Sequence, residues 1–412
     1  MELSDNRHWK LNLAMMWFSQ LMVMTGFAAL IPFIPLLFKN HIGITDEGEC
    51  GLYVSYFNIA GTLAYTLFIP IWGMLSDRYG VKIMLLRGTF GTAFIFPLMG
   101  FVSSAWLLIV LRFLTAACAG TTAAAQTLIV KNTPDSKIGF ALGVFSTAFW
   151  SGATLGNVVG GLLVDAFGYA STCIFCGVLY FIGGISVLFA HEDCKLVEKP
   201  VFKAASNRRR QGVASWIPRL TTAVWIMLFL FALNGFVRSF EVPYPAMLIE
   251  KITDPAKAAY WTGIISAFAA VGAMISGALF GYLSDRMDAK KLLLPALVLT
   301  AVMLFMQAAA ESLFAFGFGR TMMCVAGGGI QPIFQKALSC VTPKRKRGTV
   351  FGLSSTFNGL GTIGAAFCAG GVIYLFGTRA IFYTAAILTI IFIPIALSLF
   401  GKIQKSPGFN ER

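Results

Sequence analysis

Four charged residues lie deep inside long apolar stretches of this chain: Arg112, Arg238, Glu241 and Arg320. A charge in an apolar interior is costly and usually marks a functional site. Glu241 is the one carboxylate well inside such a stretch, so it is our candidate for a titrating group, with Asp165 as a weaker alternative. Arg238 lies three residues before Glu241 on one helical face. A static ion pair between these two residues would instead keep Glu241 ionised.

The stretches that hold these charges have the composition of membrane helices. The 412 residues are 57% hydrophobic and 12% charged, whereas about a quarter of the residues in a soluble domain are charged. Apolar runs of about 20 residues are long enough to cross a bilayer as helices. The ten-residue alternating segments of a membrane barrel are missing from the sequence. We therefore expect an all-α membrane protein.

The apolar runs predict twelve transmembrane helices in two groups of six. The domain boundaries that follow are 1–190 for a first bundle, 191–218 for a polar linker and 219–412 for a second bundle. The first six helices are expected at about 11–38, 51–75, 83–102, 106–130, 139–166 and 170–190. The second six are expected at about 220–249, 258–283, 292–310, 313–338, 348–375 and 380–400.

The second group of helices repeats the first. The charged turn Gly73–Lys82 recurs as Gly281–Lys290, and Arg112 recurs as Arg320 at the same offset of 208 residues. Further matches continue at an offset of 209, and one of them pairs Gly168 with Gly377. Two related six-helix bundles suggest a transporter whose halves rock about a site between them.

The basic residues predict which side of the membrane each connector occupies. Twenty-five Lys and Arg fall on the side of the two termini, and four fall on the other side: Lys39, Lys251, Lys257 and Arg379. Cytoplasmic connectors are the Lys- and Arg-rich ones. We therefore expect both termini and the linker in the cytoplasm. The net charge of +14 then belongs to these connectors, and no nucleic-acid partner is expected.

Metal, cofactor and enzyme chemistry have no support in the residues. The three His are in tails or loops, and the eight Cys lie mostly inside apolar runs, where thiols pack as small apolar groups. No nucleophile–base arrangement or phosphate loop is visible. The expected partners are a small-molecule substrate, protons and the lipid bilayer. One chain already holds both halves, so we expect a monomer.

Three segments resemble signatures of the major facilitator superfamily, in its twelve-helix drug:proton antiporter branch. Gly73–Lys82 is similar to the helix 2–3 signature, with Val81 in place of its first basic residue. Leu111–Gly120 resembles the helix 4 signature. Gly152–Gly161 resembles the helix 5 signature of exporters, with Asn157 where that signature has Pro. The resemblance covers nearly the whole chain and is nearest to bacterial multidrug exporters of this length.

The resemblance implies a gate at the cytoplasmic face. Asp77 would cap the start of helix 11 near Gly348, and Asp285 would cap the start of helix 5 near Gly139, each meeting the positive end of a helix dipole. The alternative is a solvated turn. Glycines in helix 5 would let it approach helix 8 across the two halves, or serve ordinary packing. The gating set is completed by Arg78, Lys82, Arg286, Gly152, Gly156, Gly160 and Gly161.

The resemblance also implies a central cavity from helices 1, 4, 7 and 10, with contributions from 2, 5, 8 and 11. Arg112 falls where the family has a proton-coupling arginine. Aromatic walls with few polar groups suit apolar or cationic organic compounds, although each aromatic could instead face lipid or the core. The candidates are Gln20, Phe33, Tyr56, Asn58, Trp150, Asn234, Tyr244, Gln331 and Asn358.

These features predict a proton-coupled secondary transporter that exports small drug-like or amphipathic compounds by alternating access. It would lie in the inner or plasma membrane. Three alternatives stay open on the sequence: an exporter of an endogenous metabolite such as a siderophore or sugar, a proton-coupled importer, and a membrane sensor that transports nothing.

Overall fold

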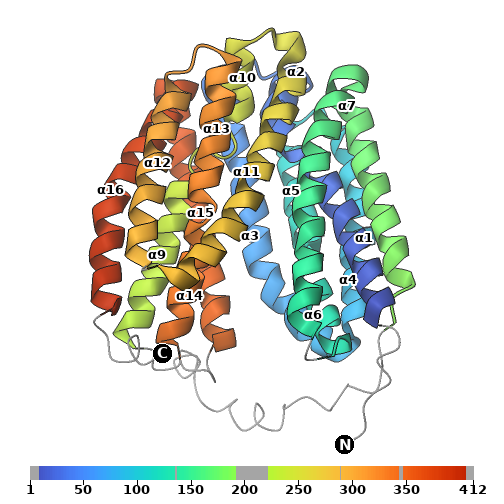
Figure 1. Cartoon of the computed structure of the whole chain (residues 1–412). Helices are drawn as coiled ribbons and strands as arrows, with labels where there is room; N and C mark the ends of the chain where they lie inside the picture. The colour runs from blue at the N-terminus through green and yellow to red at the C-terminus, as the bar shows by residue number, and fades with distance from the viewer. Residues whose placement is uncertain (1–8, 135–136, 192–220, 288, 343–346, 405–412) are drawn as a thin grey trace, which may run out of the picture.

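The computed structural model describes residues 9–134, 137–191, 221–287, 289–342 and 347–404, and these residues form a bundle of long helices (Figure 1). The first part contains α1 (Trp9–Ala28), η2 (Ile31–Phe33), α2 (Ile34–Asn40), α3 (Glu47–Tyr79), α4 (Val81–Met99), α5 (Ala105–Cys118), α6 (Thr121–Asn132) and α7 (Ile138–Leu188). The second part contains α9 (Thr222–Ser239), α10 (Pro245–Ile252), η6 (Pro255–Lys257), α11 (Ala258–Arg286), α12 (Ala289–Ala308), α13 (Leu313–Gly327), α14 (Ile330–Val341), α15 (Arg347–Phe376) and α16 (Thr378–Gln404).

Ten helical segments of the described chain are long and apolar enough to cross a membrane. One of them, α7, holds two crossings, because its 51 residues are interrupted by Gly168 in a non-helical conformation. The pair α13 and α14 supplies the twelfth crossing. Gly168 has φ +76° and Gly377 has φ +80°, a region that glycine enters without steric cost. The predicted fold of twelve helices is confirmed, and the repeated glycines separate the last two crossings of each half.

Two predicted helices are broken where prolines interrupt them. The first predicted helix divides into α1, η2 and α2, with Pro32 and Pro35 in the short elements. The seventh divides into α9 and α10, with Pro243 and Pro245 at the break. Proline lacks the N–H that would continue the helical ladder, and its ring clashes with the preceding turn. The predicted continuous helices 11–38 and 220–249 are therefore wrong in this detail.

Two more predicted helices are broken at glycines. The fourth divides at Gly120, which has φ +110° and precedes α6. The tenth divides between Gly327 and Ile330, the end of α13 and the start of α14. All four breaks occur in helices 1, 4, 7 and 10. Discontinuous helices leave backbone groups free, and transporters use such segments around their binding sites.

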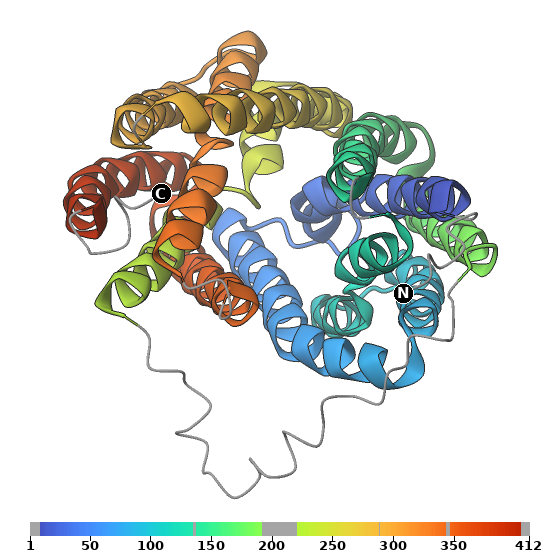
Figure 2. The ribbon, with the colours of Figure 1, turned by 60° about the horizontal axis from the view of Figure 1, so that its bottom comes forward.

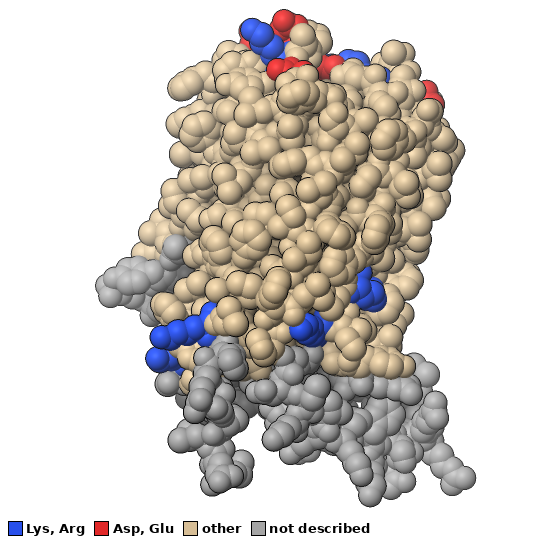
Figure 3. All heavy atoms as spheres, turned by 90° about the vertical axis from the view of Figure 1, so that its right-hand side faces the viewer, with Lys and Arg blue, Asp and Glu red and all other residues tan. Residues whose placement is uncertain are grey.

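The helices form two groups that lie side by side (Figure 2). Helices α1 to α7 make one group and α9 to α16 make the other. The long contacts between the groups are α7 with α11 and α3 with α15. On the face shown in Figure 3, charged side chains lie toward the two ends of the molecule and the band between them is uncharged. A band of this kind fits the hydrocarbon part of a bilayer.

The small-residue face of α7 packs inside its own half. A Cβ at Gly152 would lie 2.7 Å from the carbonyl oxygen of Leu21 on α1. Those at Gly156 and Gly160 would overlap the backbone at Thr25 of α1 and at Ala29, which directly follows α1. The sequence left two roles open for these three glycines, the crossing between the halves or ordinary packing, and their contacts are those of ordinary packing within the first half. They lie on the face of α7 that contacts α1, one turn apart from each other.

Gly161 makes the crossing between the halves. A Cβ at Gly161 would lie 2.9 Å from the carbonyl oxygen of Ala259 and 3.2 Å from the Cα of Gly263, both on α11. Small residues on both helices therefore bring the two backbones together at one place. The expected contact of helices 5 and 8 exists, but Gly161 and Gly263 form it.

We expect Gly160→Ala to destabilise the protein, because the new methyl group meets backbone that cannot move aside. Gly143→Ala on the same helix is the matched control, since no atom of the described residues lies within 4 Å of its Cβ position. Thermal unfolding of both purified variants in detergent measures the difference. A Gly160→Ala protein that is as stable as Gly143→Ala would contradict the close packing of α7 on α1.

Candidate functional site

A buried ion pair joins two of the four interior charges. Glu241, between α9 and α10, accepts a hydrogen bond from Nη1 of Arg320 on α13. The two side chains are only 4% and 12% exposed, respectively. The sequence suggested Arg238 as the partner of Glu241, and the structure corrects this. Arg238 instead donates to the carbonyl oxygen of Gly327 at 2.6 Å, where the end of α13 leaves its carbonyls without helical partners.

Arg112 has a different environment from its repeat mate Arg320. Its guanidinium carbon lies 5.5 Å from the ring centre of Phe27 and 5.3 Å from that of Phe57. Its Nε is buried against Gly61 and has no hydrogen-bond acceptor among the described residues. The four interior charges therefore divide into a paired site in the second half and a single arginine in the first.

A cavity of about 230 Å³ lies between the two halves, at the broken parts of helices 1 and 7. Arg320 reaches it from α13, and Asn58 reaches it from α3. Both halves thus contribute polar groups to one apolar cavity, which is the usual composition of a small-molecule site. Its polar lining is Asn58, Asn157, Thr262, Ser266 and Arg320.

Two further cavities flank this central cavity, one in each half. The site in the second half measures about 100 Å³ and is lined by Glu241, Arg238, Arg320 and Asn234. The site in the first half measures about 270 Å³ and is built around Arg112. The charged residues predicted for proton coupling are thus all at cavities, distributed over both halves.

Several predicted cavity residues lie at or near these sites. Asn58 lines the central cavity, and Asn234 lines the cavity of the second half and donates to Gln331 at 3.4 Å. Gln20 donates at 3.2 Å to Thr122, which lines the Arg112 cavity. Polar side chains in the broken helices and their neighbours therefore cluster as expected.

Other predicted cavity residues lie elsewhere. Phe33 is fully buried among apolar residues of both halves, and Tyr244 is fully buried with its hydroxyl 2.5 Å from that of Ser55. Tyr56 is 37% exposed and stacks on the exposed Trp106 at the outside of the bundle. These aromatics serve packing because their helix faces point away from the cavities.

Two further candidates line none of the three cavities described above. Trp150 packs its ring against Phe149, with 5.3 Å between the ring centres, and only Phe149 lines the Arg112 cavity. The backbone oxygen of Asn358 lies where α15 meets Gly235 of α9.

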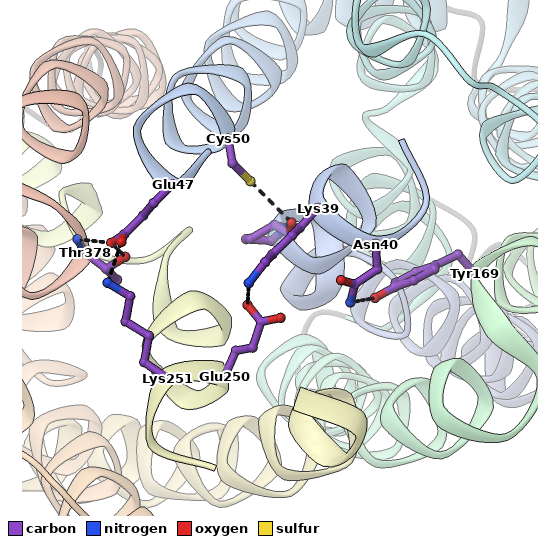
Figure 4. Close-up of polar contacts among 9 residues, drawn as sticks. Lys39, Asn40, Glu47, Cys50, Tyr169, Glu250, Lys251 and Thr378 are labelled. Carbon is purple, nitrogen blue, oxygen red and sulfur yellow. Dashed lines mark hydrogen bonds and ion pairs between the residues drawn. The ribbon is translucent and has the colours of Figure 1, made fainter. Parts of the chain in front are cut away.

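Ion pairs join the halves at the upper end of Figure 1, as the close-up in Figure 4 shows. Lys39 contacts Glu250 at 2.8 Å, and Lys251 contacts Glu47 at 2.5 Å. Glu47 also accepts from the backbone N–H of Thr378 at 2.5 Å and from its hydroxyl. A carboxylate at the start of α16 meets the positive end of that helix. We call these five residues the upper seal.

The upper seal and the neighbouring Tyr244 make every hydrogen bond between the halves that the structure describes. Tyr244 reaches Ser55 and the carbonyl oxygen of Gly51. The halves also pack closely at this end, since a Cβ at Gly48 of α3 would lie 3.1 Å from Tyr374 of α15. The two halves are thus fastened at the upper end of the bundle.

The predicted lower gate lies largely outside the described residues. The backbones of Asp77 and Arg78 end α3, and those of Asp285 and Arg286 end α11, but their side chains are not described. Lys82 donates to the carbonyl oxygens of Leu188 at 2.7 Å and Ala190 at 2.8 Å. It therefore stabilises the C-terminal end of α7 within its own half, where a cation is favourable.

Sequence reasoning missed the upper seal and part of the central cavity. Asn157 lines the central cavity, and it stands out in the sequence, because it replaces the proline of the exporter signature. Thr262 and Ser266 also line this cavity, but nothing in the sequence distinguishes them from other small polar residues of an apolar helix. Both halves carry a basic and an acidic residue near the connectors at this end of the bundle, and these charges could have suggested the seal.

A profile of the Major Facilitator Superfamily matches residues 16–222 and 262–411. Two discontinuous six-helix groups around a central cavity define a secondary transporter. The chain belongs to the Major Facilitator Superfamily, and it is therefore a multi-pass membrane transporter of small molecules and not an enzyme.

Relatives and solved structures agree with this family. The chain is 29% identical to "Multidrug resistance protein MdtG" of Enterobacter lignolyticus over 93% of this chain and 90% of that one. It is also 29% identical to the protein of the same name in Proteus mirabilis, over 93% and 94%.

Two solved transporters share the fold. A bacterial homolog of the human lysosomal transporter Spinster, in an inward-facing and occupied conformation, has a TM-score of 0.74 at 14% identity and covers 98% of this chain and 100% of its own. The nucleoside transporter NupG has a TM-score of 0.74 at 10% identity and covers 94% and 99%.

We expect Arg320→Met to destabilise the protein strongly, because it leaves Glu241 charged and buried without a partner. Breaking such a pair costs about 3–5 kcal/mol, whereas replacing both partners with apolar residues costs much less. The double variant with Glu241→Leu should therefore unfold at a higher temperature than the single variant. Thermal unfolding of the purified proteins measures this coupling.

Lys251→Met provides the matched control, since it breaks an exposed pair at the upper seal, with side chains 45% and 33% exposed. Such a pair contributes at most about 1 kcal/mol. Additive losses in the double variant of Glu241 and Arg320 would show that the two charges do not depend on each other.

Proposed function

We propose that this protein exports small drug-like or amphipathic compounds in exchange for protons, by alternating access. The observation that carries the proposal is the buried Glu241–Arg320 pair beside a cavity shared by both halves. The curated relatives named as multidrug resistance proteins support the export of drug-like compounds.

The proposed arrangement in the cell follows from the charge of the connectors. Residues 1–190 and 219–412 form the two halves, and the cytoplasmic segment 191–218 connects them. The protein lies in the cell inner membrane as a monomer, with both termini in the cytoplasm. The positive-inside bias of 25 to 4 basic residues supports this orientation.

In this orientation the upper seal faces the outside, and the structure corresponds to a state that is closed outward. Export requires the upper seal to open and the opposite end to close. The charged turns at Asp77 and Asp285 are suited to that closure, because a carboxylate stabilises the N-terminus of a facing helix. Alternating access then exchanges one set of charged contacts for the other.

The proton site in this proposal is Glu241. Protonation removes the negative partner of Arg320 and leaves its guanidinium facing the central cavity. Deprotonation restores the ion pair. Arg320 lines both the central cavity and the cavity of the second half. A change in the charge of Glu241 therefore changes the electrostatic potential where a substrate binds. The cycle requires this pair to break in one access state and to form again in the other.

We expect Glu241→Gln to abolish substrate-driven proton movement, because glutamine cannot bind or release a proton. Inverted membrane vesicles with an imposed proton gradient and a panel of drug-like compounds provide the measurement. Asp165→Asn tests the weaker candidate from the sequence: its carboxylate is exposed on α7, so we expect exchange to be unchanged. Full exchange by Glu241→Gln would remove this residue from the mechanism, and proton entry together with substrate would replace exchange with import.

A further inference from the structure

The cavity around Arg112 lies inside the first half, directly behind the wall of the central cavity. Phe57 is the shared wall: it lines the central cavity, and its ring centre lies 5.3 Å from the guanidinium carbon of Arg112 on the other side. The Arg112 cavity measures about 270 Å³. This volume is large enough for the head group and part of the apolar body of a small organic molecule.

The repeat explains why Arg112 has no carboxylate partner. Gly26 and Gly235 match at an offset of 209, so the first-half equivalent of Glu241 is Pro32. Arg320 keeps its carboxylate, whereas Arg112 makes no ion pair with any described residue and its buried Nε has no acceptor. A desolvated guanidinium without a counter-charge costs several kcal/mol (about 3–5 when a partner is removed).

The other residues of this cavity offer hydroxyl groups and rings but no carboxylate. Thr62, Tyr65 and Thr122 line it with hydroxyls, and Phe27 and Phe149 line it with aromatic faces. A planar guanidinium donates two parallel hydrogen bonds to a carboxylate, and such charge-assisted bonds are about twice as strong as neutral ones. The rings would hold the apolar part of the same molecule.

We propose that the Arg112 cavity binds the acidic head group of an amphipathic organic anion, a carboxylate on an apolar body. This inference rests on the proposed export function and specifies its substrate class. The interior charges agree with it, because they comprise three arginines and one glutamate, and this excess of positive charge would repel a cation. The sequence suggested apolar or cationic compounds, and the buried charges favour anions instead.

A matched set of ligands tests the charge requirement directly. The purified full chain in phosphatidylcholine nanodiscs is titrated with 4-phenylbutanoate, 4-phenylbutanamide and trimethyl(4-phenylbutyl)ammonium, and binding is measured by calorimetry. We expect the carboxylate to bind at least tenfold more tightly than the amide and the cation to bind least. Equal binding of the acid and the amide would overturn the proposal.

Variants locate the site. Arg112→Gln should remove the preference for the acid over the amide, and Arg112→Lys should keep part of it. Arg87→Gln is the control, because Arg87 stacks on Trp72 at 3.5 Å, outside this cavity. A preference that survives Arg112→Gln would contradict the assignment, as would its loss in Arg87→Gln. If Arg112→Gln does not fold, the Arg112→Lys variant and the ligand series still decide.

Two further arms separate this proposal from others. Adding phosphatidylglycerol to the nanodiscs tests a lipid head group as the occupant, and competition with 4-phenylbutanoate would overturn the proposal in favour of lipid. Transport is measured separately in vesicles. Binding that depends on Arg112 without any export would contradict the export function alone, whereas export of the amide and the cation but not the acid would contradict only the anion site.

Discussion

A charge in the apolar interior needs a partner close by, and this constraint explains the arrangement of the site. The second half meets it twice: Glu241 pairs with Arg320, and Arg238 bonds to the free carbonyl oxygen at the end of α13. The first half leaves Arg112 between aromatic rings. The cavities, the helix breaks and the proposed chemistry all follow from how these few charges are compensated.

The breaks in helices 1, 4, 7 and 10 lie close to those charges and leave backbone groups free to bind them. A continuous helix satisfies its own backbone, so it has no free carbonyl to offer an arginine. Pro243 and Pro245 interrupt helix 7 just after Glu241, and the glycines after Gly327 interrupt helix 10 near Arg238. Close contacts at Gly161 and in the upper seal hold the halves together around the resulting cavity.

The fold was largely predictable because its signals are local. Apolar runs, repeated glycines and the Gly73–Lys82 turn all lie within short segments of sequence. The pairing of Glu241 was not predictable, since Arg320 is 79 residues away and reaches it only because α13 packs beside α10. The face of Tyr56 was missed for a similar reason: a uniformly apolar helix carries no pattern that distinguishes cavity from lipid.

The most direct test of the account is a pair of distance distributions between spin labels. One pair replaces His41 and Lys257 at the upper end, and the other replaces Gln126 and Gln335 in the middle of α6 and α14, which are labelled in the lower part of Figure 1. All four positions are exposed, and the labels are introduced in a background without the eight native cysteines. When pH or substrate changes the access state, the account predicts that the upper distance lengthens while the lower one shortens. Distances that change in the same direction, or not at all in a protein that still transports, would contradict it.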